Sequence, residues 1–405
     1  MKKICLVVLA LIMFPTLAES RPSIWDWTNV EGENWTTAPR DITGCGICTS
    51  QGILLTLETK VRWNLGRSDL DDLRFSISYI NSCIGEGCAP TTWNFLDLWQ
   101  QDGTPFEFSD PWDYNFPEDP IELPCDPAPY WDTSRVKMGG IEMIQPPDNL
   151  EAIKQYIYEV GPVYAPMVVY MDFLSYVPGT TYVRGTDQVS GNHTITIVGY
   201  DDVMERWTVN NVPNWGDNGI GYISYDADTD LFDIEGEDIA LSAIWDPAFL
   251  CENNSPPQVP VAHFYKNWNY DMGTSIQGIT TIDGLSAILE IDDLNCNAWG
   301  NPLFYQIDWG DWQEADGPAP KEWMGQNCVK NLIAPNYRIN LGKFTVGEHQ
   351  LLFKVVDLCG EEGFSEVYNF QVDPPAPICG TIPEGNSFFV LFLITGFLAL
   401  IRKSI

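Results

Sequence analysis

The chain has 405 residues, a net charge of −35, 16 tryptophans and 45% hydrophobic residues. This length predicts two or three domains, and the hydrophobic content is sufficient for packed cores, which excludes a disordered chain. The chain contains 56 acidic and only 21 basic residues. We therefore expect no nucleic-acid partner, because binding to phosphates requires basic patches.

Residues 1–20 have the pattern of a secretory signal peptide. Lys2 and Lys3 precede an apolar run over 4–14, and Leu17-Ala18 offers a cleavage site with a small residue. The apolar run is too short to span a membrane. We therefore expect the mature protein to be exported.

The C-terminal end has a proline-containing spacer over 374–386 and an apolar tail over 387–405 that ends in Arg402, Lys403 and two further residues. A permanent span needs about 20 apolar residues, so this run is marginal. The order of Pro-Glu, apolar run and basic residues resembles the sorting signals of exosortase-type transpeptidases, with Gly385 in place of a second proline. A simple tail anchor is the alternative. Both predict attachment to the cell envelope or membrane, and the sorting signal implies release or transfer after processing.

Residues 21–252 are predicted to form one α+β domain in which helices come first and strands second. A helix is expected to begin at Cys48 and to end at Leu65, with Gly66 as its left-handed cap. A second helix is expected over 91–101. Strands rich in β-branched and aromatic residues are expected over 163–170, 194–199, 207–211 and 221–225. This order predicts two lobes, one helical and one barrel-like, with a site at their junction.

The third helix of this domain has the clearest pattern. Asp148 can cap it and Glu151 follows three residues later, which is a capping-box pattern. Gly161-Pro162 ends it. Its buried stripe is predicted to consist of Leu150, Ile153, Ile157 and Val160.

A polar linker over 253–257 separates this domain from a second one over 258–373. Short runs over 287–291, 304–309, 349–356 and 367–372 alternate apolar and polar residues, and no long helical period appears. We predict an antiparallel β-sandwich of immunoglobulin size.

Cys48 and His193 are the residues most indicative of chemistry. An ordinary thiol is mostly protonated at neutral pH, and a helix N-terminus and a nearby imidazolium both lower its pKa. Cys48 stands where a helix is expected to begin, and His193 is the only histidine between residues 21 and 254. The pair predicts a nucleophile and a general base and acid. Asn210 and Asn211, on the next strand, are candidates to orient the ring.

Cys45-x-x-Cys48 is also compatible with two other kinds of site. A redox pair of this kind usually follows a strand in a βαβ unit, and no such unit is visible. A zinc site needs more ligands at suitable spacing, and His193 stands alone. A lone histidine can also be an ordinary core residue. We expect no metal and no cofactor.

Ten cysteines remain after Cys5 leaves with the signal peptide, and in an exported chain they suggest disulfides. The first half holds an odd number, so one is unpaired, and Cys48 is the natural candidate. The spacing assigns no pairing to the later five, which are Cys251, Cys296, Cys328, Cys359 and Cys379.

The first domain resembles the papain-like cysteine peptidases over most of residues 24–226. The segments that carry the resemblance are Ile24-Trp25-Asp26-Trp27, Thr36 to Ser50, Gly161-Pro162-Val163, Phe173, Tyr176, Gly179, Tyr182, Asn192-His193-Thr194-Ile195, Gly199-Tyr200, Trp207 to Asn211 and Trp215-Gly216 to Gly219. The resemblance implies that Cys48 is the nucleophile, His193 the general base and acid, and Asn211 the orienting residue, with Asn210 in reserve. It also implies the disulfides Cys45–Cys88 and Cys83–Cys125, which would leave Cys48 free.

Several positions depart from the family pattern. Ile42 stands where the family has a glutamine that donates to the oxyanion, and loss of one such donor typically costs about 100- to 1,000-fold in rate. Thr49 replaces the tryptophan after the nucleophile. Gly87-Cys88-Ala89-Pro90 stands where the family has a Gly-Cys-x-Gly-Gly segment whose backbone binds substrate, and proline lacks an N–H. These departures predict weak or narrow activity.

The second domain resembles PKD-like and other immunoglobulin-like modules of bacterial and archaeal surface proteins. Asp308-Trp309-Gly310-Asp311 is similar to one of their strands, and the segment from Gly347 to Asp357 is similar to their final hairpin. Such modules act as spacers or adhesion units, so no site is expected in this one.

Together these features predict an exported, surface-attached cysteine endopeptidase that acts on proteins or peptides. The alternative is a weak or inactive papain-like domain that serves as a surface binding or adhesion module. A transpeptidase or amidase that uses the same pair of residues is a third option.

Overall fold

The computed structural model describes residues 21–42, 47–84, 103–111, 125–132, 134–144, 149–226, 233–234, 237–238, 240–245, 248–251, 254–293, 295–330, 332 and 338–375. They belong to two compact units. The first unit runs to Ser255 and also includes Asp293–Gly300 and Met324–Ile333, whereas the second comprises the segments between these and the remainder of the chain. In the described ranges, no helix has the length and apolar character needed to cross a membrane. The tail over 387–405 lies outside them.

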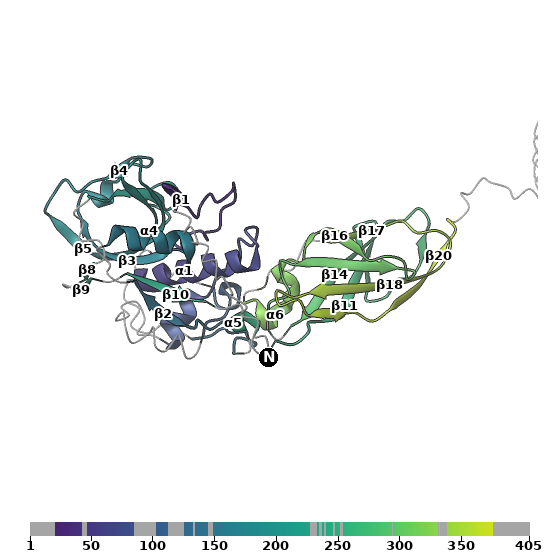
Figure 1. Ribbon diagram of the computed structural model, residues 1–405. Coiled ribbons are helices and arrows are strands. Elements are labelled where there is room, and N and C mark those ends of the chain that lie inside the picture. The colour runs from purple at the N-terminus through teal and green to yellow at the C-terminus, as the bar shows by residue number, and fades with distance from the viewer. Residues whose placement is uncertain are drawn as a thin grey trace, which may run out of the picture. The chain divides into compact units, whose positions relative to one another are not determined.

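The first unit is built on an eight-stranded sheet with the order β2-β10-β3-β5-β6-β7-β4, and β1 pairs with β5 (Figure 1). Its strands are β1 (Ile24–Asp26), β2 (Gly140–Met143), β3 (Val163–Tyr170), β4 (Thr181–Tyr182), β5 (Val189–Asp201), β6 (Arg206–Asn210), β7 (Ile220–Ser224) and β10 (Leu241–Ile244). The short strands β8 (Asp233–Ile234) and β9 (Glu237–Asp238) pair with each other. The four strands predicted from the sequence are all present, and β5 is longer than expected.

Helix α1 (Cys48–Leu65) has the predicted ends. Gly66 adopts φ 65° and donates its N–H to the carbonyls of Arg62 and Trp63, which closes the helix. Residues 49–62 are all buried, because one face packs on the sheet and the rest of the unit covers the others. At Gly52 an added Cβ would lie 2.9 Å from the ring of Tyr164 on β3. Only glycine therefore allows the helix to approach the sheet this closely.

Helix α4 (Leu150–Glu159) differs from its prediction in two details. Its cap is Asn149, whose Oδ1 accepts from the N–H groups of Glu151 and Ala152, whereas the expected cap, Asp148, lies outside the described residues. Val160 is 42% exposed and is not part of the buried stripe, because it follows the helix and no longer keeps the helical period. Ile153 and Ile157 are buried as predicted. The helix predicted over 91–101 lies outside the described residues.

The helical part of the first unit encloses a buried ion pair. Arg40 and Glu58 are both inaccessible to solvent, with Arg40 Nη2 2.6 Å from Glu58 Oε1. Glu58 also accepts from Phe75 N–H at 2.8 Å and from the hydroxyl of Thr37.

The shorter helices are α2 (Ile77–Tyr79), η1 (Ile80–Ile84), η2 (Glu107–Ser109), η3 (Phe173–Ser175), α5 (Ala248–Cys251), η4 (Lys321–Met324) and α6 (Gly325–Cys328).

Two segments that the sequence assigned to the sandwich belong to the first unit. A disulfide joins Cys296 to Cys328 and so ties Asp293–Gly300 to Met324–Ile333. Trp299 packs edge-on against Phe106 and Phe108, with ring centroids 5.9 and 5.6 Å apart. These contacts link residues nearly 200 positions apart, so no local pattern could have shown them.

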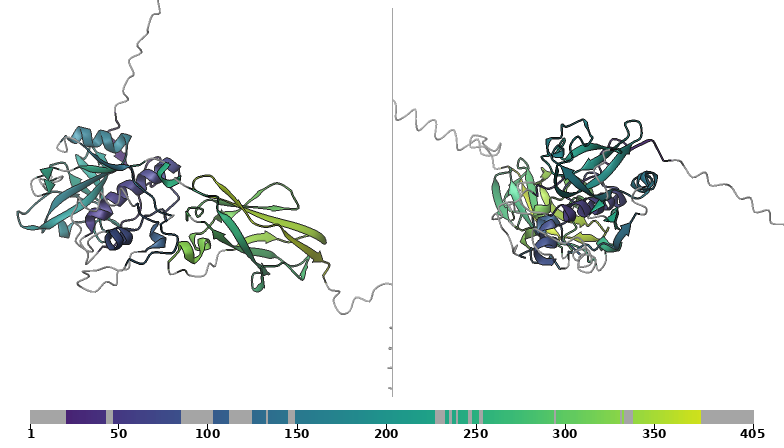
Figure 2. Two further views of the ribbon diagram at one scale, coloured as in Figure 1. Left: turned by 90° about the horizontal axis from the view of Figure 1, so that it is seen from below. Right: turned by 90° about the vertical axis from the view of Figure 1, so that its left-hand side faces the viewer.

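The second unit is a sandwich of two sheets (Figure 2). One has the order β12-β11-β14-β17, and the other has the order β13-β20-β18-β15-β16 with β19 beside β18. All pairings are antiparallel except that of β13 with β20, which is parallel. Phe264, Phe353 and Tyr368 from the two sheets meet in its core. The strands are β11 (Gln258–Lys266), β12 (Tyr270–Gly273), β13 (Ile279–Thr280), β14 (Leu285–Asp292), β15 (Pro302–Ile307), β16 (Gln313–Pro318), β17 (Ile339–Gly342), β18 (Gly347–Val356), β19 (Glu362–Phe364) and β20 (Tyr368–Asp373).

Candidate active site

Cys48 is the first residue of α1, where the unpaired N–H groups of the first turn and the helix dipole favour negative charge. Its side chain is half-buried, and it is the one free thiol among the cysteines that the structure describes. Cys83 and Cys125 form a disulfide with a Cα–Cα distance of 4.8 Å. Cys45 and Cys88 lie outside the described residues. Cys251 and Cys359 are each disulfide-bonded.

His193 lies on β5 and Asn211 directly follows β6, and their side chains meet. His193 Nε2 is 2.7 Å from Asn211 Oδ1. A carboxamide oxygen can only accept, so Nε2 carries a proton and Nδ1 is the nitrogen available to Cys48. The backbone holds Asn211 in place, because its N–H donates to Gly219 O at 2.8 Å and its carbonyl accepts from Gln51 Nε2 at 3.2 Å. Gln51 thus connects the helix that carries Cys48 to the residue that orients His193.

Asn210, the other candidate, faces elsewhere. Its Nδ2 donates to the carbonyl of Thr37 at 3.2 Å, and its side chain is buried. Successive residues of an extended chain point to opposite sides, so only one of the two asparagines can face His193. The structure brings Asn211 to the ring.

Cys48 and His193 form a coupled pair. Burial by itself would raise the pKa of the Cys48 thiol, but the hydrogen bond and the charge of His193, with a smaller contribution from Thr194, lower it to about 7. Burial would likewise lower the pKa of His193, but its interactions with Cys48 and its hydrogen bond to Asn211 raise it above the ordinary value. Each group thus favours the charged form of the other. Near neutral pH this arrangement supplies a thiolate beside an imidazolium.

Two further residues at the site were not anticipated. Thr194, which follows His193 on β5, helps to lower the pKa of the Cys48 thiol. Tyr164, on β3, is fully buried near the thiol. Burial raises the pKa of its phenol above the ordinary value, and the negative charge of Cys48 raises it further. The sequence carried a signal for Thr194, because the family that it resembles has alanine at this position, directly after the histidine. Tyr164 carried none, because only packing brings it to α1.

A hollow of about 280 Å³ opens beside His193 and Asn211. His193 and Asn211 form part of its wall, and Trp215 closes one side, stacked on Tyr176 with centroids 4.2 Å apart. The other lining residues are Val169, Phe173, Leu174, Ser190, Gly191, Asn192 and Val212. The wall is mostly apolar, so the hollow suits an apolar side chain.

The position of the family's oxyanion donor is filled by a buried apolar side chain. Ile42 is 7% exposed and carries no donor. The segment between it and Ile47 lies outside the described residues. Pro90 and the segment around it also lie outside them. The backbone N–H of Cys48, at the first position of α1, is the donor that this geometry offers to an oxyanion.

The lobed α+β fold, the thiol at a helix N-terminus and the His–Asn hydrogen bond together define a cysteine hydrolase of the papain type. A family model described as "Papain family cysteine protease" matches residues 21–240, which is more than half of the chain. The chain belongs to this family, and its first unit is a cysteine peptidase domain.

Solved structures of cysteine proteases are similar to this chain at low sequence identity. Bromelain from Ananas comosus, in complex with the E64 inhibitor, is 18% identical, with a TM-score of 0.43, 56% of this chain covered and 100% of that one. Xylellain, a cysteine protease from Xylella fastidiosa, is 17% identical, with a TM-score of 0.44, 56% of this chain covered and 88% of that one. Among curated proteins no match was found.

Proposed function

We propose that this protein is an exported, envelope-attached cysteine endopeptidase that cleaves peptide bonds through an acyl-enzyme on Cys48. The observation that carries the proposal is the linked set of Cys48, His193 and Asn211, in which the thiol pKa is lowered to about 7. A group with this pKa is substantially ionised at neutral pH, and a thiolate is the reactive form of cysteine.

The reaction follows from the protonation states of the pair. The Cys48 thiolate attacks the carbonyl carbon of the scissile bond, and the carbonyl electrons move to its oxygen. When the tetrahedral intermediate collapses, the C–N bond breaks and His193 Nδ1 gives its proton to the leaving amine. Water then attacks the thioester, His193 takes a proton from it, and the thiolate leaves with release of the acid. Asn211 keeps Nε2 occupied, so the ring presents Nδ1 throughout.

The apolar hollow beside His193 supports a preference for substrates with an apolar side chain near the scissile bond. Without a donor from Ile42, stabilisation of the oxyanion rests on fewer groups. The activity is therefore expected to be weaker than that of a site with two donors.

The decisive experiment is labelling of the mature protein with an epoxide inactivator of papain-type enzymes, read by intact mass between pH 6 and 8. One adduct that disappears in Cys48→Ala and in His193→Ala supports the peptidase. A folded protein whose Cys48 thiol reacts with iodoacetamide but never with the epoxide would contradict it. Asn210→Ala is the matched control for Asn211→Ala, because it removes the neighbouring asparagine without touching the ring.

The second candidate is a weak or inactive domain kept as a surface binding module, and Ile42 is the observation that favours it. The two candidates differ in the need for an ionised thiol. A peptide library would show turnover for the first and retention without cleavage for the second. A transpeptidase or amidase would appear in the same assay as acyl transfer to an added amine or as release of ammonia.

Export and envelope attachment are proposed from the two ends of the sequence. Lys2, Lys3 and the apolar run over 4–14 support a cleaved signal peptide, and the apolar run before Arg402 supports an envelope anchor or sorting tail. Fractionation of cells and intact mass of the surface form would test both. A full-length chain found only in the cytoplasm would refute them.

A further inference from the structure

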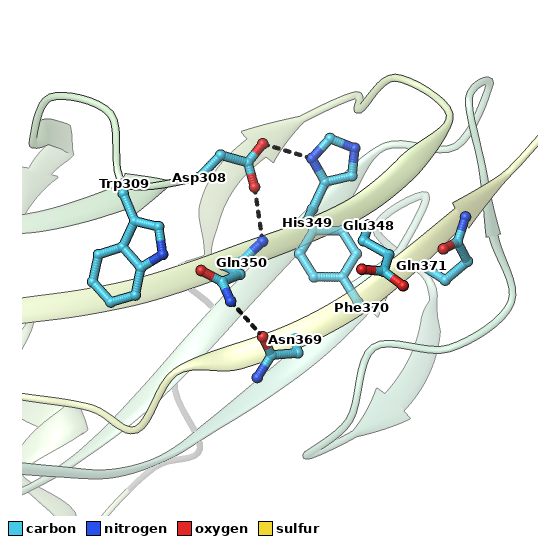
Figure 3. A pocket seen from close by; sticks show the side chains of 8 residues that line it. All are labelled: Asp308, Trp309, Glu348, His349, Gln350, Asn369, Phe370 and Gln371. Carbon is cyan, nitrogen blue, oxygen red and sulfur yellow. Dashed lines mark hydrogen bonds and ion pairs between the residues drawn. The ribbon is translucent and has the colours of Figure 1, made fainter.

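A hollow in the second unit lies on the outer face of the six-stranded sheet, far in sequence from the peptidase residues. It measures about 520 Å³, which is within the usual range of small-ligand sites. Figure 3 shows its lining: Asp308, Trp309, Glu348, His349, Gln350, Asn369, Phe370 and Gln371. No lysine or arginine is among them. The sequence predicted no site in this unit.

The hollow combines an exposed tryptophan ring with a row of polar side chains. Trp309 stands at the end of β15 and is 63% exposed. Across β18 and β20, Glu348 faces Gln371 and Gln350 faces Asn369 in register. These four side chains alternate with buried His349 and Phe370, so they share the outer face of the sheet. The result is a flat polar surface with a large ring at one edge (Figure 3).

The backbone presents Trp309 in an unusual way. Asp308 and Trp309 have φ 51° and 57°, and Gly310 N–H donates to Ile307 O at 2.9 Å, which is the hydrogen-bonded turn that asparagine and glycine normally occupy. A bulky residue in this left-handed conformation is disfavoured, and such strain is a reason to look for function. Here the position that favours glycine carries the largest side chain.

Hydrogen bonds to strand β18 hold this turn in place. Asp308 N–H donates to Gln350 O at 3.0 Å, and Gln350 N–H donates to Asp308 Oδ1 at 2.8 Å. Asp308 Oδ2 lies 2.8 Å from His349 Nδ1, and His349 Nε2 lies 2.9 Å from the carbonyl of Thr345. Both partners of the ring are acceptors, so His349 is held as an imidazolium that fixes Asp308. Trp309 is therefore pre-positioned, which reduces the entropy lost when a ligand binds.

The polar groups left open indicate the chemistry of a ligand. Gln350 Nε2 donates to Asn369 Oδ1 at 2.9 Å, which leaves an acceptor on Gln350 and donor capacity on Asn369. Asn369 Nδ2 donates one N–H to Val367 O at 3.4 Å and Gln371 Nε2 donates one to Val372 O at 3.1 Å, so each amide keeps a second N–H. Glu348 adds a carboxylate. Both carboxylate oxygens of Asp308 already bond to β18. Glu348 is therefore the only charged side chain of the lining that remains available to a ligand. Neutral amides match groups that both donate and accept, as hydroxyls do. The lining contains no lysine or arginine, and the charge of His349 is already paired with Asp308, which disfavours phosphate or carboxylate ligands.

We propose that this hollow is a saccharide-binding site, in which a neutral sugar ring stacks on Trp309 and its hydroxyls bond to Glu348, Gln350, Asn369 and Gln371. A flat ring with C–H groups on one face and hydroxyls around its edge fits an indole plate beside a row of amides. The site would hold the protein on a glycan independently of the peptidase.

The test is native affinity electrophoresis of the mature chain carrying Cys48→Ala, in gels that contain a neutral soluble polysaccharide. Hydroxyethylcellulose, glycol chitin, mannan and soluble starch are each run beside polygalacturonate. We expect at least one neutral polymer to retard the protein, and Trp309→Gly to weaken that binding about 30-fold, the usual effect of removing a central aromatic contact. Retardation by none of the neutral polymers, or by polygalacturonate alone, would overturn the proposal.

The fold offers controls for both stability and position. Glycine relieves the strained φ at residue 309, so Trp309→Gly should keep or raise the melting temperature while binding is lost. Trp268 is the matched control, because it is 49% exposed with φ 66° in another turn of the same unit and does not line the hollow. Trp268→Gly should leave binding unchanged. Equal loss of binding in both variants would show non-specific adhesion of tryptophan, and would refute the site.

Discussion

His193 Nε2 and Asn211 Oδ1 lie 2.7 Å apart, although His193 is on β5, Asn211 follows β6, and they are 18 residues apart in sequence. This hydrogen bond determines which ring nitrogen faces Cys48. It also makes Asn211, rather than Asn210, the residue on which the protonation state of His193 depends.

Asn211→Ala should lower kcat/KM about 10- to 100-fold, because a hydrogen bond to a charged group contributes roughly 1.5–3 kcal/mol. Asn210→Ala should leave kcat/KM within about twofold once folding is confirmed by circular dichroism. Peptide hydrolysis by the two variants checks the prediction. Equal losses in both would mean that Asn211 acts only through the fold.

The Cys48 thiol should titrate near neutral pH. Below pH 7 it is protonated and unreactive, and above pH 7 it is the thiolate, so alkylation by iodoacetamide should rise with a midpoint of about 7. His193→Ala removes the hydrogen bond and charge that lower this pKa and leaves burial, which raises it. The midpoint should then move to 9.0, the ordinary value, or higher. An unchanged midpoint in this variant would mean that His193 does not lower the pKa of Cys48.

Ile42→Gln should increase kcat by restoring a side-chain donor to the oxyanion, by up to about 100- to 1,000-fold if the amide reaches the family position. Ile42→Leu keeps the side chain apolar and should change kcat by no more than about twofold. The comparison of initial rates on one peptide substrate is sufficient. If neither variant differs from the wild type, another donor already serves the oxyanion.

Glu58→Ala should destabilise the first unit by about 3–5 kcal/mol, since it removes the fully buried carboxylate that pairs with Arg40 and accepts from Phe75 N–H. The matched control is Asp69→Ala, which breaks the half-exposed pair with Arg67 and should cost less than about 1 kcal/mol. Urea unfolding followed by tryptophan fluorescence measures both. A cost below 1 kcal/mol for Glu58→Ala would mean that Glu107 compensates for the lost charge.

Local chemistry explains why parts of the fold could be predicted. Helix α1 was placed from Cys48 to Gly66 because the apolar period and a left-handed glycine cap are encoded within the segment itself. Strand β3 was predicted with the bounds that the structure shows, because its β-branched and aromatic residues are also a feature of the segment itself. The cap of α4 was missed because Asp148 and Asn149 have the same capping chemistry, and only backbone geometry distinguishes them.

The amino-acid sequence by itself indicated the class of chemistry, because Cys48 and His193 stand in segments that resemble the papain-like peptidases. Their positions alone left a core histidine and other roles of the thiol open. Tertiary structure decided which asparagine meets His193, since neighbouring residues of a strand face opposite sides. It also assigned Asp293–Gly300 to the first unit and brought Trp309 beside the amides of β18 and β20. These relationships depend on contacts between segments far apart in the chain, and no local periodicity or spacing records them.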